Sequence, residues 1–133
     1  MDKKTAFTII NNYFNSWLHQ DKELFLSQLH DEIIVRECTG DMYNNKVIAS
    51  NWFAGWNIEG NKVLRWEICE SHYDREKQVA VVEWVFECMY ESNKYSFEGA
   101  SIVEFKDGLI IKIGEYKMDI NKKYPYGKRS KVT

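Results

Sequence analysis

The stretch FEGASIVEFKDGLIIKIGEY, residues 97–116, decides the fold. Apolar and polar residues alternate on both sides of Asp107-Gly108, a pair typical of a two-residue turn between antiparallel strands. The alternation predicts a hairpin whose inner face ends in a carboxylate, which suggests a sheet that closes one side of a pocket. The residues expected on that face are Phe97, Gly99, Ser101, Val103, Phe105, Leu109, Ile111, Ile113 and Glu115.

Two more alternating stretches precede this hairpin. The first is a strand whose inner face carries Leu64, Trp66 and Ile68 and continues through Glu70 and His72. The second is a strand whose inner face carries Val82, Trp84 and Phe86. Together the four strands form an antiparallel meander. Gly99 and Gly114, which lie inside two of them, predict a bulge or a sharp bend.

The N-terminal half is mainly helical. Apolar residues at helical spacing predict one helix over residues 4–19 and another that ends near Asn57, with Asp21 as the N-cap of a short helix between them. Alternation over residues 33–38 predicts one strand, and residues 40–45 are expected to form a loop. The order α-α-β-α-β-β-β-β segregates helices from antiparallel strands. It predicts an α+β fold with three helices on one face of a strongly curved, mostly antiparallel sheet.

The 133 residues are enough for one domain with a single core, which we assign to residues 1–118. Residues 119–133 form a basic C-terminal tail. We expect this tail to be solvated, although contact with a partner is the alternative. Its charged residues are Asp119, Lys122, Lys123, Lys128, Arg129 and Lys131.

Composition argues against several classes of function. The formal net charge of -2 does not favour binding to nucleic acid or to an anionic membrane, and no signal-peptide core or run of about 20 apolar residues occurs. Cys38, Cys69 and Cys88 are odd in number and form no CxxC pair, so we expect free thiols in a cytoplasmic protein. The histidines lack metal-ligand spacing and no cofactor motif is present, so we expect neither a metal nor a cofactor.

Candidate catalytic residues stand where apolar strand faces end. Glu37 ends one such face, and Glu115 ends another. If these ends converge, they form an apolar cup with a few polar groups, as at many small-molecule sites. Burial raises the pKa of a carboxyl group, so Glu37 or Glu115 could serve as a general base. The alternative is that both glutamates are simply hydrated at fraying strand ends.

Aromatic residues supply the remaining candidates. Tyr13 and Trp17 lie four residues apart on the first helix, where the phenol could donate a hydrogen bond to a substrate oxygen. Trp52 and Trp56 could form a wall against a flat ligand. Ordinary core packing produces the same spacing in both pairs, so this alternative stays open.

The chain resembles the SnoaL-like branch of the nuclear transport factor 2-like superfamily over about residues 4–118. This resemblance implies a cone-shaped α+β barrel with a pocket at its wide end and frequent dimerisation through the sheet. The features that carry it are Tyr13, Phe14 and Trp17 on the first helix, residues 31–37, Trp52, residues 82–84, the Phe97-x-Gly99-x-Ser101 pattern, residues 105–108, Glu115 and Tyr116.

The resemblance also implies roles for single residues. Tyr13 and Glu37 fall at places similar to the tyrosine and carboxylate of ketosteroid isomerases, and Ser101 falls near the second hydrogen-bond donor of those enzymes. Glu115 is compatible with a last-strand carboxylate of polyketide cyclases and epoxide hydrolases. Trp84 and Phe86 stand where the hydrolases have an arginine and an aspartate, which argues against the hydrolase mechanism.

The leading hypothesis is therefore binding of a small hydrophobic carbonyl compound, with isomerase- or cyclase-like proton transfer. Glu37, Glu115 and Tyr13 would be catalytic, and the ligand would contact Trp17, Trp52, Trp56, Trp84, Phe86 and Ser101. The alternatives are a noncatalytic hydrophobic-ligand-binding module and a dimeric structural protein with a vestigial pocket. We also expect a homodimer through the sheet, whose outward residues would include Val85, Ile102, Ile110, Tyr116 and Met118.

Overall fold

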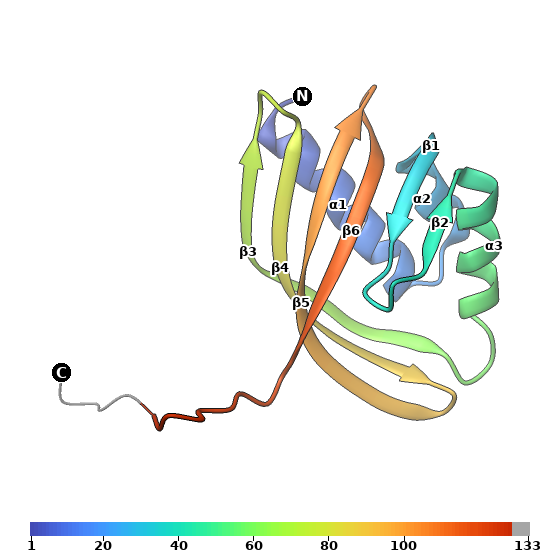
Figure 1. Ribbon diagram of the computed structural model, residues 1–133. Coiled ribbons are helices and arrows are strands. Elements are labelled where there is room, and N and C mark those ends of the chain that lie inside the picture. Colours follow the sequence, from blue (N-terminus) through green and yellow to red (C-terminus); the bar gives the residue numbers. More distant parts are fainter. Residues whose placement is uncertain (129–133) are drawn as a thin grey trace.

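Three helices lie against one side of a six-stranded, strongly curved sheet (Figure 1). The computed structural model describes residues 1–128, so the expectations for Arg129 and Lys131 lie outside the described residues. The elements in chain order are α1 (Lys3–Leu18), α2 (Lys22–Ser27), β1 (Leu29–Arg36), β2 (Met42–Asn44), α3 (Lys46–Trp56), β3 (Lys62–Asp74), β4 (Val79–Tyr90), β5 (Asn93–Lys106) and β6 (Leu109–Asp119).

The strands are arranged in the order β2-β1-β6-β5-β4-β3. Only the β1–β6 pair is parallel among the described strands, and all other neighbours are antiparallel. The predicted α+β architecture is therefore confirmed. The one addition is β2, which lies in the expected loop and pairs with the end of β1. A strand of three residues is too short to be recognised from an alternation of apolar and polar residues.

The β5–β6 hairpin forms as predicted, with Asp107 at φ 55° and Gly108 at φ 74° in its two-residue turn. The inner face of β6 differs from the expectation. Phe105 pairs with Ile110 and Glu104 pairs with Lys112, so the residue between them is extra and forms a bulge. The bulge turns Ile110 into the core, where none of its surface is exposed. The expectation that Ile110 faces outward, and that Leu109 and Ile111 face inward, was therefore wrong.

Two further register shifts change the faces of β3. They lie between Val63 and Arg65 and between Ile68 and Glu70. Val63 and Trp66 consequently point into the core, whereas Leu64 is 42% exposed. After the second shift, Glu70 pairs with the outward-facing Glu83, so Glu70 and the exposed His72 lie on the outer face. The prediction of Leu64, Glu70 and His72 on the inner face was wrong, because each extra residue reverses the alternation.

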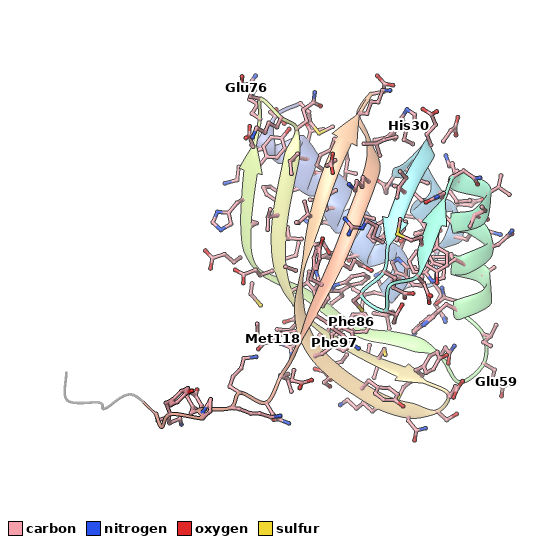
Figure 2. All side chains as sticks on the ribbon, viewed as in Figure 1. His30, Glu59, Glu76, Phe86, Phe97 and Met118 are labelled. Carbon is pink, nitrogen blue, oxygen red and sulfur yellow. The ribbon has the colours of Figure 1, made fainter. Side chains whose placement is uncertain are left out.

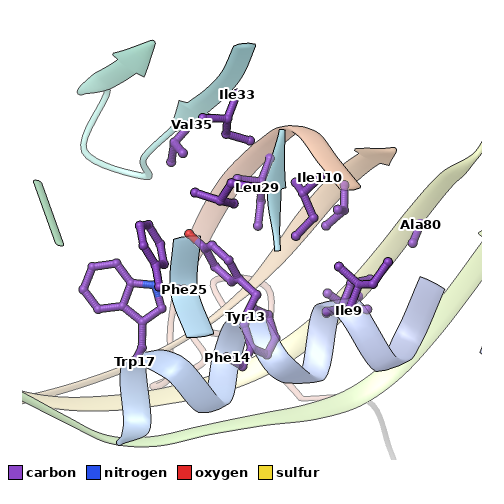
Figure 3. Close-up of a cluster of buried hydrophobic side chains, with 14 of the residues drawn as sticks. Ile9, Tyr13, Phe14, Trp17, Phe25, Leu29, Ile33, Val35, Ala80 and Ile110 are labelled. Carbon is purple, nitrogen blue, oxygen red and sulfur yellow. The ribbon is translucent and has the colours of Figure 1, made fainter. Parts of the chain in front are cut away.

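The core lies between α1 and the concave face of the sheet (Figure 3). Tyr13, Phe14 and Trp17 project from α1 into it, and the ring of Phe14 stacks on Trp66 with centroids 4.1 Å apart. Asp21 caps α2 as predicted by accepting a hydrogen bond from the backbone N–H of Leu24. Among residues 1–128, no helix is both long enough and apolar enough to cross a bilayer.

Gly99 allows an indole ring to lie directly on the backbone of β5. A Cβ atom at this position would overlap both the ring of Trp84 and the backbone oxygen of Tyr116. Neither Gly99 nor Gly114 interrupts the β5–β6 ladder, so of the bulge or sharp bend expected at these glycines the bulge is absent from both positions. Gly99 is needed for a close approach and not for a change in register.

Candidate functional site

A cavity of about 270 Å³ opens where β1 ends beside the middle of β6. Its lining residues are Arg36, Glu37, Cys38, Gly40, Met42, Glu115 and Tyr116. Parallel pairing places Val35 beside Ile113 and Arg36 beside Gly114, so the next residues, Glu37 and Glu115, approach each other. The long-range pairing of β1 with β6 thus brings both predicted carboxylates to one cavity.

Glu115 is held in an environment that favours its neutral form. Its Oε2 atom is shielded from solvent and has no hydrogen-bond partner within residues 1–128. Burial, and to a smaller extent the negative charge of Glu37, raise the pKa of Glu115 to about 8. At pH 7 Glu115 is therefore mainly a carboxylic acid, which can donate a hydrogen bond.

Glu37 lies in the short loop between β1 and β2 and is only half-buried. Its Oε1 atom accepts hydrogen bonds from the Tyr43 hydroxyl at 3.1 Å and from the Thr39 hydroxyl at 3.2 Å. Burial raises the pKa of Glu37, the two hydrogen bonds oppose that shift, and the charge of Asp41 adds to it. Its Oε2 atom makes no hydrogen bond within the described chain and is free to take a proton.

Tyr13 is completely buried and does not line the cavity, although its phenol is close enough for the charges of Glu115 and Glu37 to affect it. Its oxygen has no hydrogen-bond partner among residues 1–128, and Figure 3 shows that oxygen on the side of the ring toward Trp17 and Phe25. Burial is the main reason that the pKa of Tyr13 lies well above its usual value, and the charges of Glu115 and Glu37 contribute. Tyr13 is therefore a neutral hydrogen-bond donor at physiological pH.

Ser101 lies directly opposite Glu115 on the neighbouring strand β5. Its hydroxyl oxygen accepts a hydrogen bond of 2.9 Å from the indole N–H of Trp84, and both side chains are buried. None of the hydrogen bonds in residues 1–128 uses the hydroxyl hydrogen of Ser101, so a donor remains beside Glu115.

The predicted aromatic wall lies in packed clusters outside the lining of this cavity. Trp17 contacts Trp52 and Trp56, with ring centroids 4.8 and 5.8 Å apart. Trp84 and Phe86 pack around Trp66 on the sheet, and Figure 2 shows Phe86 beside Phe97 near the point where β6 leaves the sheet. A second, wider hollow of about 500 Å³ around residues 57–62 contains no predicted site residue.

Sequence reasoning missed the residues that support Glu37. Tyr43 binds the carboxylate and stacks on Trp52 with centroids 4.4 Å apart, so α3 holds its phenol in place. Met42 and Cys38, which line the cavity, were missed as well. All three lie in or beside the polar run 39–45, where no hydrophobic period distinguishes a site from a loop.

Within residues 1–128, no group of His, Cys, Asp and Glu side chains could hold a metal ion.

Solved structures share this fold at low sequence identity. An LEH-like epoxide hydrolase from Mycobacterium tuberculosis superimposes with a TM-score of 0.77 and 12% identity, over 86% of this chain and 84% of its own. A candidate polyketide cyclase from Pseudomonas putida gives 0.73 and 16%, over 84% and 90% of the two chains. An NTF-2 like protein of unknown function from Burkholderia xenovorans gives 0.73 and 12%, over 96% and 97%.

No protein-family model matches the sequence, and no curated protein matches it. The structural matches nevertheless confirm the predicted resemblance at the level of the fold. The chain has the nuclear transport factor 2-like fold that the SnoaL-like proteins share.

Proposed function

We propose that this protein binds a small hydrophobic carbonyl compound and moves a proton on it by general acid–base catalysis. One observation carries the proposal: Glu37 and Glu115 line one cavity, and Glu115 has a shielded, unpaired oxygen whereas Glu37 is half-buried and accepts two hydrogen bonds that oppose the rise in its pKa. Two carboxyl groups with different pKa values provide a base and an acid at the same pH.

Glu37 would be the base. Its free Oε2 atom would take a proton from the carbon next to the carbonyl group, and the electron pair of the broken C–H bond would move onto the carbonyl oxygen. The proton would then return from Glu37 to another carbon of the resulting enolate. General-base catalysis of this kind contributes roughly 10²- to 10⁴-fold in rate.

The developing oxyanion would be stabilised by neutral donors. Glu115 in its acid form and Tyr13 both hold hydrogens in a region shielded from water, where hydrogen bonds to negative charge are strong. Ser101 offers a further hydroxyl beside Glu115. The names of the structural neighbours, which include a cyclase, a hydrolase and a candidate isomerase from Bacillus subtilis, are compatible with small-molecule chemistry.

Isomerisation of cyclohex-3-en-1-one to its conjugated isomer, followed by ultraviolet absorbance, tests this proposal. Glu37→Gln is expected to lower kcat/KM by about 10²- to 10⁴-fold, because the base is lost. Glu115→Gln is expected to lower it by no more than about tenfold at pH 7, because an amide still donates a hydrogen bond. The wild-type rate should rise with pH as Glu37 ionises and fall as Glu115 ionises near pH 8.

The control is Glu76→Gln, which alters an exposed carboxylate in the turn between β3 and β4 and should leave the rate unchanged. Glu115→Gln should also remove the alkaline fall in rate. A Glu37→Gln variant that retains the wild-type rate would exclude Glu37 as the base. Binding of the ketone without any turnover would instead support a noncatalytic binding module.

Tyr43→Phe tests whether the Tyr43 hydroxyl tunes Glu37. Removing a donor to the carboxylate is expected to raise the pKa of Glu37 further, because the hydrogen bond favours the charged form. A carbon-13 NMR titration of the Glu37 carboxyl group measures this change. Tyr73→Phe is the matched control, since the Tyr73 hydroxyl donates to the backbone oxygen of Met1. Equal midpoints in both variants would contradict the role assigned to Tyr43.

A further inference from the structure

The segment after β6 extends away from the rest of the molecule, and its apolar side chains are exposed to solvent. We call residues 120–128 the C-terminal arm, and Figure 1 shows that it projects away from the sheet. Ile120 and Tyr124 are 41% and 55% exposed, and Tyr126 is fully exposed. Exposed tyrosines on a projecting segment are typical of a surface that contacts another molecule.

The arm has local order that presets its shape. The N–H of Gly127 donates a 2.9 Å hydrogen bond to the carbonyl of Tyr124, which closes a turn with Pro125 at its second position. The Lys128 ammonium lies 5.3 Å from the centroid of the Tyr124 ring. At the base of the arm, Lys122 donates a 2.6 Å hydrogen bond to Glu98 on β5. The arm is therefore anchored at one end and partly preorganised, which lowers the entropic cost of docking.

The outer face of the sheet has complementary properties. Its exposed apolar residues include Ile102, Tyr116 and Met118, which are 39%, 49% and 60% exposed. Glu70 and Glu83 lie directly opposite each other on β3 and β4, and neither forms an ion pair within residues 1–128. Like charges in such a cross-strand pair are destabilising, so this face would gain from a positive charge placed between them.

We propose that the C-terminal arm of one molecule lies across the outer sheet face of a second copy of this chain. The arm would bring Lys123, which has no ion pair within the described residues, to the Glu70–Glu83 pair. Its tyrosines would cover Ile102 and Tyr116 on the partner. In a two-fold dimer each copy would donate its arm and receive the other, so the contact occurs twice.

The dimensions of the arm permit this contact. Residues 120–123, which carry Lys123, span up to about 14 Å when extended. That length exceeds the roughly 10 Å that separates two sheets packed face to face, so Lys123 can reach the outer face of a partner's sheet. Two exchanged arms would cover the exposed parts of four tyrosine rings, and the partner surface beneath them would add to the buried area.

Variants that reverse the charges of Lys123 and Glu83, studied by sedimentation velocity of the full chain, distinguish this contact from other modes of association. We expect a dimer at 10 µM in about 50 mM salt. Lys123→Glu and Glu83→Lys should each raise the dimer Kd by at least about tenfold, and the double variant should recover to within about threefold of wild type. Tyr126→Ser should also weaken the dimer. Lys4→Glu, an exposed change on α1, is the matched control and should have no effect.

All four positions are exposed, so the variants should keep the wild-type circular dichroism spectrum and thermal midpoint. A monomeric wild-type chain at 10 µM would overturn the proposal. A dimer that is insensitive to both Lys123→Glu and Tyr126→Ser would also overturn it, because association would then not involve the arm. Neither result depends on the chemistry proposed at Glu37.

Discussion

The free energy of unfolding is expected to fall by about 4 kcal/mol between pH 5 and pH 9 because of one side chain, Glu115. In the folded chain the pKa of Glu115 is about 8, whereas its usual value is 4.5. The folded state therefore binds the proton more tightly than the unfolded state. The resulting stabilisation is fully present below about pH 4.5 and is lost as the pH rises through about 8. Urea denaturation at several pH values measures it.

Glu115→Gln isolates this contribution from that of other titrating groups. The amide cannot ionise, so the variant should be a few kcal/mol more stable than wild type at pH 9 and similar to it at pH 5. Glu76→Gln, in the exposed turn between β3 and β4, should retain the pH dependence of wild type. If Glu115→Gln and wild type lose stability in parallel as the pH rises, the carboxyl group is not buried as described.

Replacing Gly99 with alanine is expected to lower the free energy of unfolding by about 3 kcal/mol or more. The new Cβ atom would overlap the backbone oxygen of Tyr116, which cannot move without breaking the β5–β6 ladder. It would also overlap the indole of Trp84, which the hydrogen bond to Ser101 holds in place. Denaturant unfolding of purified protein, or loss of folded protein on expression, measures the effect.

Gly114→Ala provides a matched control on the adjacent strand. There the nearest atom to a new Cβ is in the Tyr116 ring at 3.6 Å, which is an ordinary van der Waals contact. We expect a loss of about 1 kcal/mol or less. Similar losses in the two variants would show that Trp84 does not lie on Gly99.

Much of the fold could be predicted from the sequence because its signals are local. Asp107 and Gly108 fixed the hairpin turn, and Asp21 marked the start of α2. The faces of β3 and β6 were assigned in part wrongly. A bulge changes which residues face the core, but the apolar and polar residues of the sequence do not reveal where the bulge lies. Its position follows from the curvature that the sheet needs to wrap around α1, and no single strand contains that information.

The two carboxylates of the candidate site could be predicted from the sequence, but the residues that donate hydrogen bonds to Glu37 could not. Glu37 and Glu115 each end an apolar alternation, and this signal is visible along the chain. Tyr43 and Thr39 act through single hydrogen bonds to Glu37, which depend on the path of the loop after β1. The predicted aromatic residues lie in packed clusters outside the lining of the cavity, so their contact with a ligand stays a prediction.

The central place of β6 in the sheet has a consequence for biosynthesis. This strand is the last of those in residues 1–128, yet it separates β1 from β5 and supplies Glu115. As the polypeptide emerges from the ribosome, β1 and β5 therefore remain without their shared neighbour until β6 itself has been made. Nascent chains that stall before β6 would expose two unpaired strand edges, which makes them candidates for chaperone binding or aggregation.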